Sequence, residues 1–215
     1  LETHGSWLKQ GVIEPSWNVP GSIGCWRGCT LDRAVSNFES FKNHVSVLFW
    51  SLGNESYAGD ILVEMNRYYK EKDPDRLVHY EGVAENRPYE DLISDMESQM
   101  YASPEKIKEY LENNPKKPFI LCEYMHDMGN SLGGMESYIR LLDQYEDYQG
   151  GFIWDYIDQA LFVKDEGTGR DVLRYGGDFD DRPSDYEFSG NGILFEDRTE
   201  KPAMQEVRHY YGLRR

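Results

Sequence analysis

Short apolar runs alternate with amphipathic stretches along most of the chain. Runs rich in β-branched and aromatic residues, which are typical of buried strands, occur at 45–50, 77–80, 93–101, 119–124 and 151–156. The spacing of apolar residues between them predicts helices at 31–41, at 59–72, from Pro104 onward and around 138–145. Strands that alternate with helices or long loops predict an α/β fold, in which right-handed crossovers join parallel strands.

Polar and ionisable side chains gather where the predicted strands end. They are Asn54 and Glu55, Glu81, Glu123 and His126, and Asp155 and Asp158. A (β/α) barrel carries its chemistry at the carboxyl ends of its strands, and an open doubly wound sheet also binds ligands at that edge. The glycine patterns G-x-G-x-x-G and G-x-x-x-x-G-K-[ST] do not occur in the sequence. This argues against a nucleotide-binding fold.

Composition and charge narrow the class of partner. The 215 residues include 23 Lys and Arg against 39 Asp and Glu, which gives a net charge of −16. This charge repels phosphate backbones and anionic headgroups, so neither nucleic acid nor a membrane is an expected partner. The apolar runs are also far shorter than the roughly 18 to 20 residues that span a bilayer. Cys25, Cys29 and Cys122 form neither an even-numbered disulfide framework nor a zinc pattern, which favours a reducing, cytoplasmic setting.

Two glutamates follow buried strands and are candidates for catalysis. Glu55 lies in the turn 51–56, which is rich in small residues, and Glu123 ends the run 119–124. Desolvation at a strand end raises the pKa of a carboxyl group, and two facing carboxyl groups divide into an acid and a base, as glycoside hydrolysis requires. A structural interpretation, in which an arginine or a backbone turn holds each glutamate, fits the same residues.

Other polar and aromatic residues have two interpretations each. Glu2 and His4 would project together from an extended backbone and share a divalent cation, or they form a solvated terminus. His126 is either a ligand of the substrate or a loop histidine with internal partners. Trp154 is either a platform for a sugar ring or a core residue. The aromatic content of 14% suits both sugar stacking and Tyr-rich packing.

The order of several motifs resolves part of this ambiguity. The sequence resembles the catalytic domain of the beta-galactosidases of glycoside hydrolase family 2, and the resemblance covers essentially the whole chain. The motifs that carry it include Glu2-Thr3-His4-Gly5, Trp50-Ser51-Leu52-Gly53-Asn54-Glu55-Ser56, His79-Tyr80-Glu81-Gly82, Met100-Tyr101-Ala102, Ile120-Leu121-Cys122-Glu123-Tyr124-Met125-His126, Met128-Gly129-Asn130-Ser131, Gly151-Phe152-Ile153-Trp154-Asp155, Tyr175-Gly176-Gly177-Asp178-Phe179, Asn191-Gly192 and Asp197-Arg198.

The resemblance implies a role for each matching residue. Glu55 would be the general acid/base and Glu123 the nucleophile of a retaining reaction, so their carboxyl groups are expected roughly 5 to 5.5 Å apart. Asn54 would bind the 2-hydroxyl of the sugar. The remaining residues implied to bind substrate are Met100, Tyr101, His126, Trp154 and Asn191.

The resemblance also implies two metal ions. Glu2, His4 and Glu55 match the family's Mg²⁺ ligands, whereas the carbonyl of Phe188 and the side chain of Asn191 match its Na⁺ site, which meets the galactose 6-hydroxyl. Asp127 stands where the family usually has a small residue. An inward orientation would raise the pKa of Glu123, whereas an orientation toward water would have no effect.

The fold implied by the resemblance is a partial (β/α)8 TIM barrel, with residues 1–215 as a single domain that supplies strands four to eight. The first three strands and the flanking β-sandwich domains are expected outside this sequence. The implied function is hydrolysis of β-galactosides such as lactose. A family 2 enzyme for another sugar, such as a β-glucuronidase or β-mannosidase, is an alternative, as is an inactive sugar-binding or assembly fragment. The isolated chain is expected to form a homo-oligomer or to join the rest of its parent enzyme, because unpaired strands expose apolar surface.

Overall fold

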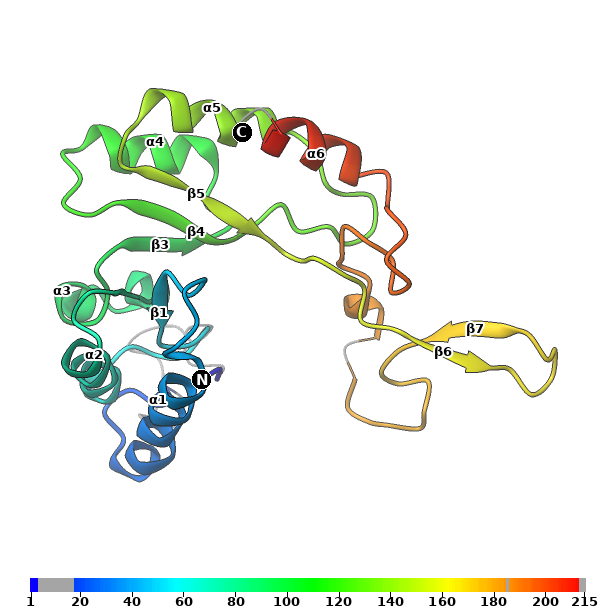
Figure 1. Cartoon of the computed structure of the whole chain (residues 1–215), viewed down its shortest axis with the longest axis horizontal. Helices are drawn as coiled ribbons and strands as arrows, with labels where there is room; N and C mark the ends of the chain where they lie inside the picture. Colours follow the sequence, from blue (N-terminus) through cyan, green and yellow to red (C-terminus); the bar gives the residue numbers. More distant parts are fainter. Residues whose placement is uncertain (4–17, 185, 213–215) are drawn as a thin grey trace. The chain divides into compact units, whose positions relative to one another are not determined.

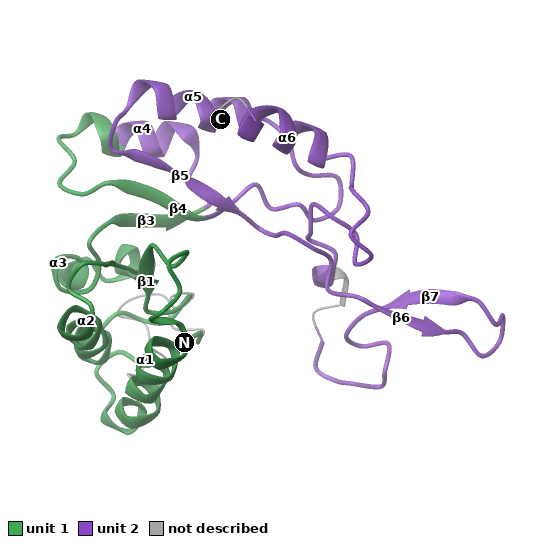
Figure 2. Ribbon diagram, viewed as in Figure 1, with its two compact units in different colours: residues 1–100, 110–122 green, residues 101–109, 123–215 purple. Residues whose placement is uncertain are grey.

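The computed structural model describes residues 1–3, 18–184 and 186–212. They form two compact units, of which unit 1 comprises residues 1–100 and 110–122 and unit 2 comprises residues 101–109 and 123–215 (Figure 1, Figure 2). Helices and short strands alternate along the chain, which confirms the predicted α/β class. No helix among the described residues combines the length and apolar character needed to cross a membrane.

Unit 1 is built on alternating helices and strands. In chain order they are α1 (Arg27–Phe41), β1 (Phe49–Ser51), α2 (Asp60–Lys72), β2 (Leu77–His79), α3 (Glu90–Ile93) and β3 (Glu97–Met100). Strands β1 and β2 pair in parallel, with Trp50 opposite Val78 and Ser51 opposite His79. The parallel pairing follows the prediction, and it brings the carboxyl ends of β1 and β2 to the same edge.

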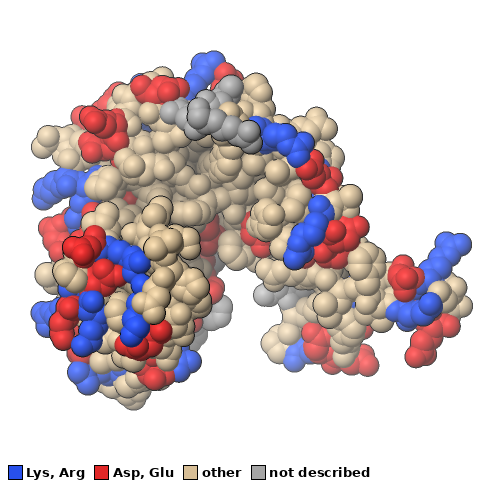
Figure 3. Space-filling model, in the orientation of Figure 1, with Lys and Arg blue, Asp and Glu red and all other residues tan. Residues whose placement is uncertain are grey.

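The core of unit 1 is aromatic. Trp50 and Tyr69 stack with ring centroids 5.3 Å apart, and Phe38 packs against both rings. All three side chains are buried. These rings stabilise the packing of α1 and α2 against β1 through apolar burial, so this part of the aromatic content serves the core. On the face shown in Figure 3, acidic and basic side chains are interspersed over unit 1.

Strand β4 (Phe119–Tyr124) passes from unit 1 into unit 2. The three strands β3, β4 and β5 (Tyr148–Ile153) follow that order in one sheet. Helix α4 (Pro104–Glu112) begins at the predicted proline. The backbone N–H of Lys106 donates to the hydroxyl of Ser103 at 3.4 Å, so Ser103 caps this helix.

Unit 2 continues with α5 (Met135–Gln144), a hairpin of β6 (Leu161–Lys164) and β7 (Asp171–Arg174), and α6 (Met204–Gly212). Met135, Ile193, Leu194 and Val207 form its buried apolar cluster. Helix α6 also holds the start of α5, because the carboxylate of Glu206 accepts the backbone N–H of Met135 at 2.8 Å. The hairpin and α6 were not among the predicted elements.

Four predicted strands have different bounds in the structure, and the one predicted at 77–80 differs by a single residue, since β2 ends at His79. The run 45–50 yields a strand only from Phe49, because 44–47 forms a turn in which Val45 is 92% exposed. Ile93 ends helix α3, so the strand predicted at 93–101 covers only Glu97–Met100. The strand predicted at 151–156 is shifted to Tyr148–Ile153.

Candidate active site

In unit 1, Glu55 follows β1 in a backbone conformation that is uncommon for a residue with a side chain. Its φ angle is +52°, in the left-handed region. Its backbone N–H donates to Oε1 of Glu81 at 2.5 Å. The preceding residue, Asn54, donates its own N–H to the carbonyl of Leu1 at 2.7 Å. Hydrogen bonds to other segments therefore hold the turn that carries Glu55.

A buried histidine supports the start of the same turn. His79, at the end of β2, places Nδ1 3.0 Å from the hydroxyl of Ser51 and Nε2 2.7 Å from the hydroxyl of Ser98. Burial lowers the pKa of His79 to about 4, so the ring is neutral at pH 7. The hydroxyl of Ser51 donates to the carbonyl of Gly53 at 3.3 Å. Because Ser51 uses its one hydrogen in that bond, it must accept from His79, so Nδ1 of His79 carries the proton. Nε2 then accepts the hydroxyl hydrogen of Ser98.

The two residues after His79 contact the end of the turn. The hydroxyl of Tyr80 donates to the carbonyl of Ser56, and both residues are fully buried. Glu81 is also buried, and burial raises its pKa to about 7. Its second oxygen, Oε2, has no hydrogen-bond partner among the described residues. Sequence reasoning identified Glu81 only as a strand-end carboxylate and assigned no role to His79 or Tyr80.

In unit 2, Tyr101 and Glu123 are joined by two hydrogen bonds. The backbone N–H of Tyr101 donates to the carbonyl of Glu123 at 2.9 Å, and the phenolic hydroxyl donates to its carboxylate oxygen Oε2 at 2.7 Å. Tyr101 has a φ of +51°, and Met125, two residues after Glu123, has a φ of +54°. The phenol is thus placed to donate to the carboxylate in its ionised, nucleophilic form.

Other predicted substrate residues gather in the same unit. The ring of His126 lies between two others, with its centroid 5.7 Å from that of Tyr101 and 5.5 Å from that of Phe188. Trp154 donates its backbone N–H to Tyr124 at 3.1 Å, and its buried indole Nε1 finds no acceptor among the described residues. An indole N–H with no partner suits a position beside a polar ligand.

The predicted Na⁺ ligands also lie together. The side-chain amide of Asn191 contacts the carbonyl of Phe188 through Nδ2, and its buried Oδ1 has no partner in the described part of the chain. A 180° flip of the amide places Oδ1 beside the Phe188 carbonyl. Two oxygen donors would then face the same point, and this donor set fits a hard monovalent cation.

Asp127 points into unit 2. It is 3% exposed, its Oδ2 lacks a partner among the described residues, and burial raises its pKa to about 6. The charges that act on it belong to Lys201, Asp158 and Asp155. Lys201 pairs with Asp158 at 2.7 Å, so its positive charge is already shared. The inward orientation follows one of the two predicted alternatives.

The predicted Mg²⁺ ligands are described in part. Glu2 forms a parallel β-bridge with Asn54, which precedes Glu55. His4 lies outside the described residues. Among the residues that the structure describes, no group of three His, Cys, Asp or Glu side chains is placed to hold a metal. The two described ligands supply carboxylate oxygens, which Mg²⁺ prefers.

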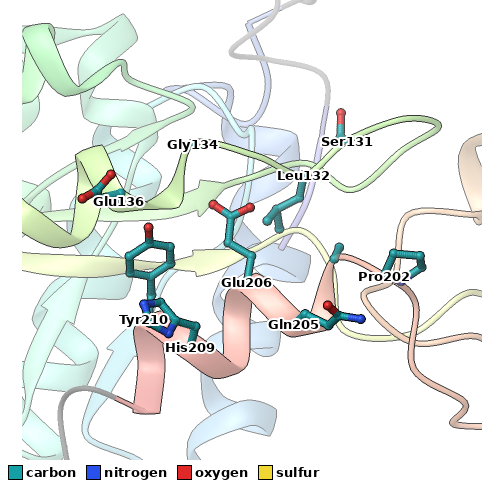
Figure 4. Close-up of a pocket in the computed structure, with 10 residues that line it drawn as sticks. Ser131, Leu132, Gly134, Glu136, Pro202, Gln205, Glu206, His209 and Tyr210 are labelled. Atoms are coloured by element: carbon teal, nitrogen blue, oxygen red, sulfur yellow. The ribbon is translucent and has the colours of Figure 1, made fainter.

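A cavity of about 730 Å³ in unit 2 lies apart from the predicted site residues (Figure 4). Its lining includes Leu132, Glu136, Gln205, Glu206 and His209, from α5, α6 and the loop before α5. Figure 4 shows the Glu206 side chain directed toward the loop at Leu132. None of the residues expected to bind sugar lines this cavity, so it does not contribute to the candidate site.

Glu55 in unit 1 and Glu123 in unit 2 each lie at or just after the end of a strand of an α/β scaffold, and Glu123 accepts a hydrogen bond from Tyr101. The chain matches the family described as "Glycosyl hydrolases family 2, TIM barrel domain" over residues 1–214, and it belongs to this family. It is 72% identical over 212 residues to the "Beta-galactosidase large subunit" of Latilactobacillus sakei, which covers 99% of this chain and 34% of that protein. The protein of the same description from Lactobacillus helveticus is 68% identical over 213 residues, again 34% of its length. The chain therefore spans about a third of these curated relatives.

Solved structures support the fold at lower identity. Lactobacillus rhamnosus beta-glucuronidase matches 92% of this chain and 37% of its own, with a TM-score of 0.62 and 17% identity. Bacteroides uniformis beta-glucuronidase matches 90% of this chain and 26% of its own, with a TM-score of 0.58 and 20% identity. Identity at this level shows a shared fold and does not transfer the sugar.

Proposed function

We propose that the protein containing this chain is a retaining beta-galactosidase, which removes terminal β-D-galactose from β-galactosides such as lactose. The observation that carries the proposal is the 72% identity with a curated beta-galactosidase large subunit across 99% of the chain. The hydrogen bond from Tyr101 to the carboxylate of Glu123 supports it, because a retaining reaction needs an ionised carboxylate as its nucleophile.

The proposed reaction has two displacements. In the first, a carboxylate oxygen of Glu123 bonds to the anomeric carbon, the glycosidic bond breaks, and the carboxylic acid of Glu55 gives its proton to the departing oxygen. In the second, Glu55 takes a proton from water, the water oxygen bonds to the anomeric carbon, and the ester to Glu123 breaks. The hydroxyl of Tyr101 stabilises Glu123 as it regains its negative charge in this second step.

The substrate-binding residues are part of the proposal. Asn54 would bind the 2-hydroxyl of the sugar, and His126 would bind other hydroxyl groups. Trp154 would form an apolar wall, with its unpartnered indole N–H available to a polar group. Met100, at the end of β3, precedes Tyr101 and would line the same region.

Two cations complete the proposed site. Mg²⁺ held by Glu2, His4 and Glu55 would tune the proton affinity of Glu55. Na⁺ held by the carbonyl of Phe188 and by Asn191 would bind the sugar 6-hydroxyl, which the unpartnered Oδ1 of Asn191 supports. We expect chelation of divalent ions to lower the hydrolysis rate and removal of Na⁺ to raise KM. An unchanged rate after chelation would remove the Mg²⁺ assignment.

A partner subunit and a location also belong to the proposal. The relatives are named as large subunits, so we propose that the complete protein assembles with a second subunit or with copies of itself. A cytoplasmic location is supported by the free thiols of Cys25, Cys29 and Cys122.

The competing proposal is a family 2 enzyme for another sugar, because the similar folds include beta-glucuronidases. A comparison of nitrophenyl β-galactoside, β-glucuronide and β-mannoside with the complete protein separates the alternatives. We expect kcat/KM for the galactoside to exceed the other two values by at least about 100-fold, since a site that hydrogen-bonds a substrate hydroxyl group can discriminate by about 10⁴-fold or more. Preference for the glucuronide would contradict the galactosidase proposal, and absence of all three activities would favour a binding or assembly role.

A further inference from the structure

We propose that Glu81 is a positioning residue, whose carboxylate fixes the backbone of Glu55 and so the placement of the acid/base carboxyl group. The inference rests on the proposed function, since it assigns Glu81 a task in the first displacement. Glu81 lies in the motif His79-Tyr80-Glu81-Gly82, but the resemblance implies no role for it and it is not among the predicted site residues.

The first step of the argument is the backbone of Glu55. A residue with a Cβ adopts a φ of +52° only when its surroundings determine that conformation, because the left-handed region is disfavoured for all residues except glycine. The peptide N–H of Glu55 donates to Oε1 of Glu81 at 2.5 Å. Glu81 therefore supplies a contact that helps to fix how the backbone of Glu55 leaves the strand end.

The second step is the setting of Glu81 itself. It is 5% exposed, and burial of a carboxyl group has a cost that ordinary surface glutamates avoid. Gly82 explains how the chain places it there, because a Cβ at Gly82 would lie 2.5 Å from the ring of Tyr80 and 2.8 Å from the carbonyl of Ser56. The segment 80–82 is thus packed directly against the turn 55–56. The carboxyl group of Glu81 is therefore hydrogen-bonded to the turn and not exposed to solvent.

The third step is that Glu81 belongs to a set of contacts made by three consecutive residues. His79 hydrogen-bonds to the hydroxyl of Ser51, and Tyr80 donates to the carbonyl of Ser56. Glu81 accepts the backbone N–H of Glu55, which lies between Ser51 and Ser56 in the sequence. The first two contacts fix the ends of the turn. Of these three contacts, the one from Glu81 is made to the residue proposed to carry the proton, so its loss would loosen the backbone of Glu55 while the ends of the turn stay in place.

The test compares two replacements of nearly equal size in the complete protein. E81Q keeps an oxygen that accepts the Glu55 N–H, whereas E81M fills the same volume without an acceptor. E85M is the matched control, because Glu85 is exposed and lies four residues further along the same segment. Each variant is assayed for kcat/KM, which reports the first displacement, with lactose and with a dinitrophenyl galactoside, whose leaving group needs no proton. Circular dichroism and a thermal melt establish that each variant is folded.

We expect E81M to reduce kcat/KM by about 100-fold with lactose and by less than about 10-fold with the dinitrophenyl substrate, because a displaced acid matters only when the leaving group needs its proton. E81Q and E85M are expected to stay within a few-fold of wild type with both substrates. Equal losses of E81M on both substrates, or an E81Q defect as large as that of E81M, would overturn the proposal.

If E81M does not fold, E81D gives the second test, since it withdraws the carboxylate by one methylene group. The same dependence on leaving group is then expected, and wild-type behaviour of E81D would overturn the proposal. Failure of the proposed function is recognised separately, because the wild-type protein would then prefer another sugar. The leaving-group comparison is in that case made with activated and unactivated glycosides of the preferred sugar.

Discussion

The hydroxyl of Tyr101 lies 2.7 Å from a carboxylate oxygen of Glu123, while the backbone N–H of Tyr101 bonds to the carbonyl of the same residue at 2.9 Å. The backbone hydrogen bond fixes the position of the Tyr101 main chain, and the side-chain hydrogen bond fixes the position of its hydroxyl group. A donor held in two places stays directed at the carboxylate through both displacements of the proposed reaction, so its removal has a specific kinetic consequence.

Replacement of Tyr101 by Phe removes only the hydroxyl. We expect kcat to fall by about 100-fold or more, because Glu123 must leave as an anion when the glycosyl ester is hydrolysed and the donor that stabilises this anion is lost. Rapid-mixing kinetics with a dinitrophenyl galactoside should then show a burst of released phenol, since the ester accumulates. A steady rate without a burst would place the main effect of Tyr101 in the first displacement.

The division of labour between the two glutamates gives a second prediction. E55Q is expected to lower kcat/KM strongly for lactose and only slightly for a galactoside with a good leaving group, because the amide cannot supply a proton. E123Q is expected to lose activity toward both substrates, because it lacks the nucleophile. Equal losses of E55Q on both substrates would contradict the assignment of Glu55 as the acid.

A third prediction concerns pH and the neutral ring of His79. Its pKa is lowered to about 4 by burial, whereas an unfolded chain has the ordinary value of about 6.5. As pH falls from about 6.5 to 4 the unfolded state takes up the proton first, so the folded state loses up to about 3 kcal/mol. H79Q keeps a donor and an acceptor but does not titrate. As the pH is lowered from 7.5 to 4.5, the urea midpoint of wild type should fall relative to that of H79Q. A constant difference between the two midpoints would contradict a buried neutral histidine.

A fourth prediction concerns Asp127, whose effect on stability has the opposite pH dependence to that of His79. Its pKa is raised to about 6, so the ionised carboxylate destabilises the folded protein above that pH and protonation relieves the cost below it. We therefore expect D127N to be more stable than wild type at pH 7.5 by up to about 3 kcal/mol, with the advantage fading toward pH 4. Urea unfolding at the two pH values measures this. A D127N variant that is less stable at pH 7.5 would show that the carboxylate is needed by Lys201.

The sequence predicts the fold best where an apolar run is also a buried run. Phe119–Tyr124 has the predicted bounds, and its side chains are mostly buried. The run at 45–50 fails because Val45 lies in a turn and Leu48 precedes the strand, and both side chains are exposed. Strands β6 and β7 were missed because their side chains are all exposed or half-buried, with Leu161 and Phe162 both outside the core.

The candidate site was predictable to a different extent. The sequence motifs identify Glu55, Glu123 and Tyr101, since these belong to ordered motifs on the chain. The hydrogen bonds from His79, Tyr80 and Glu81 to the turn 51–56 join residues that are 24 to 28 positions apart in the sequence. No periodic pattern in the sequence indicates such long-range hydrogen bonds. The three residues belong to the motif His79-Tyr80-Glu81-Gly82, but the motif does not indicate what these side chains contact.

The identity of the nucleophile is the central claim, and trapping the glycosyl-enzyme tests it most directly. The fluorine of a 2-deoxy-2-fluoro-galactoside slows both displacements, whereas a good leaving group speeds up only the first, so a covalent intermediate accumulates. Digestion and tandem mass spectrometry of the complete protein should locate the fluorosugar on the peptide that contains Glu123, on the carboxylate of that residue. A label on another residue, or inactivation without any covalent label, would contradict the account.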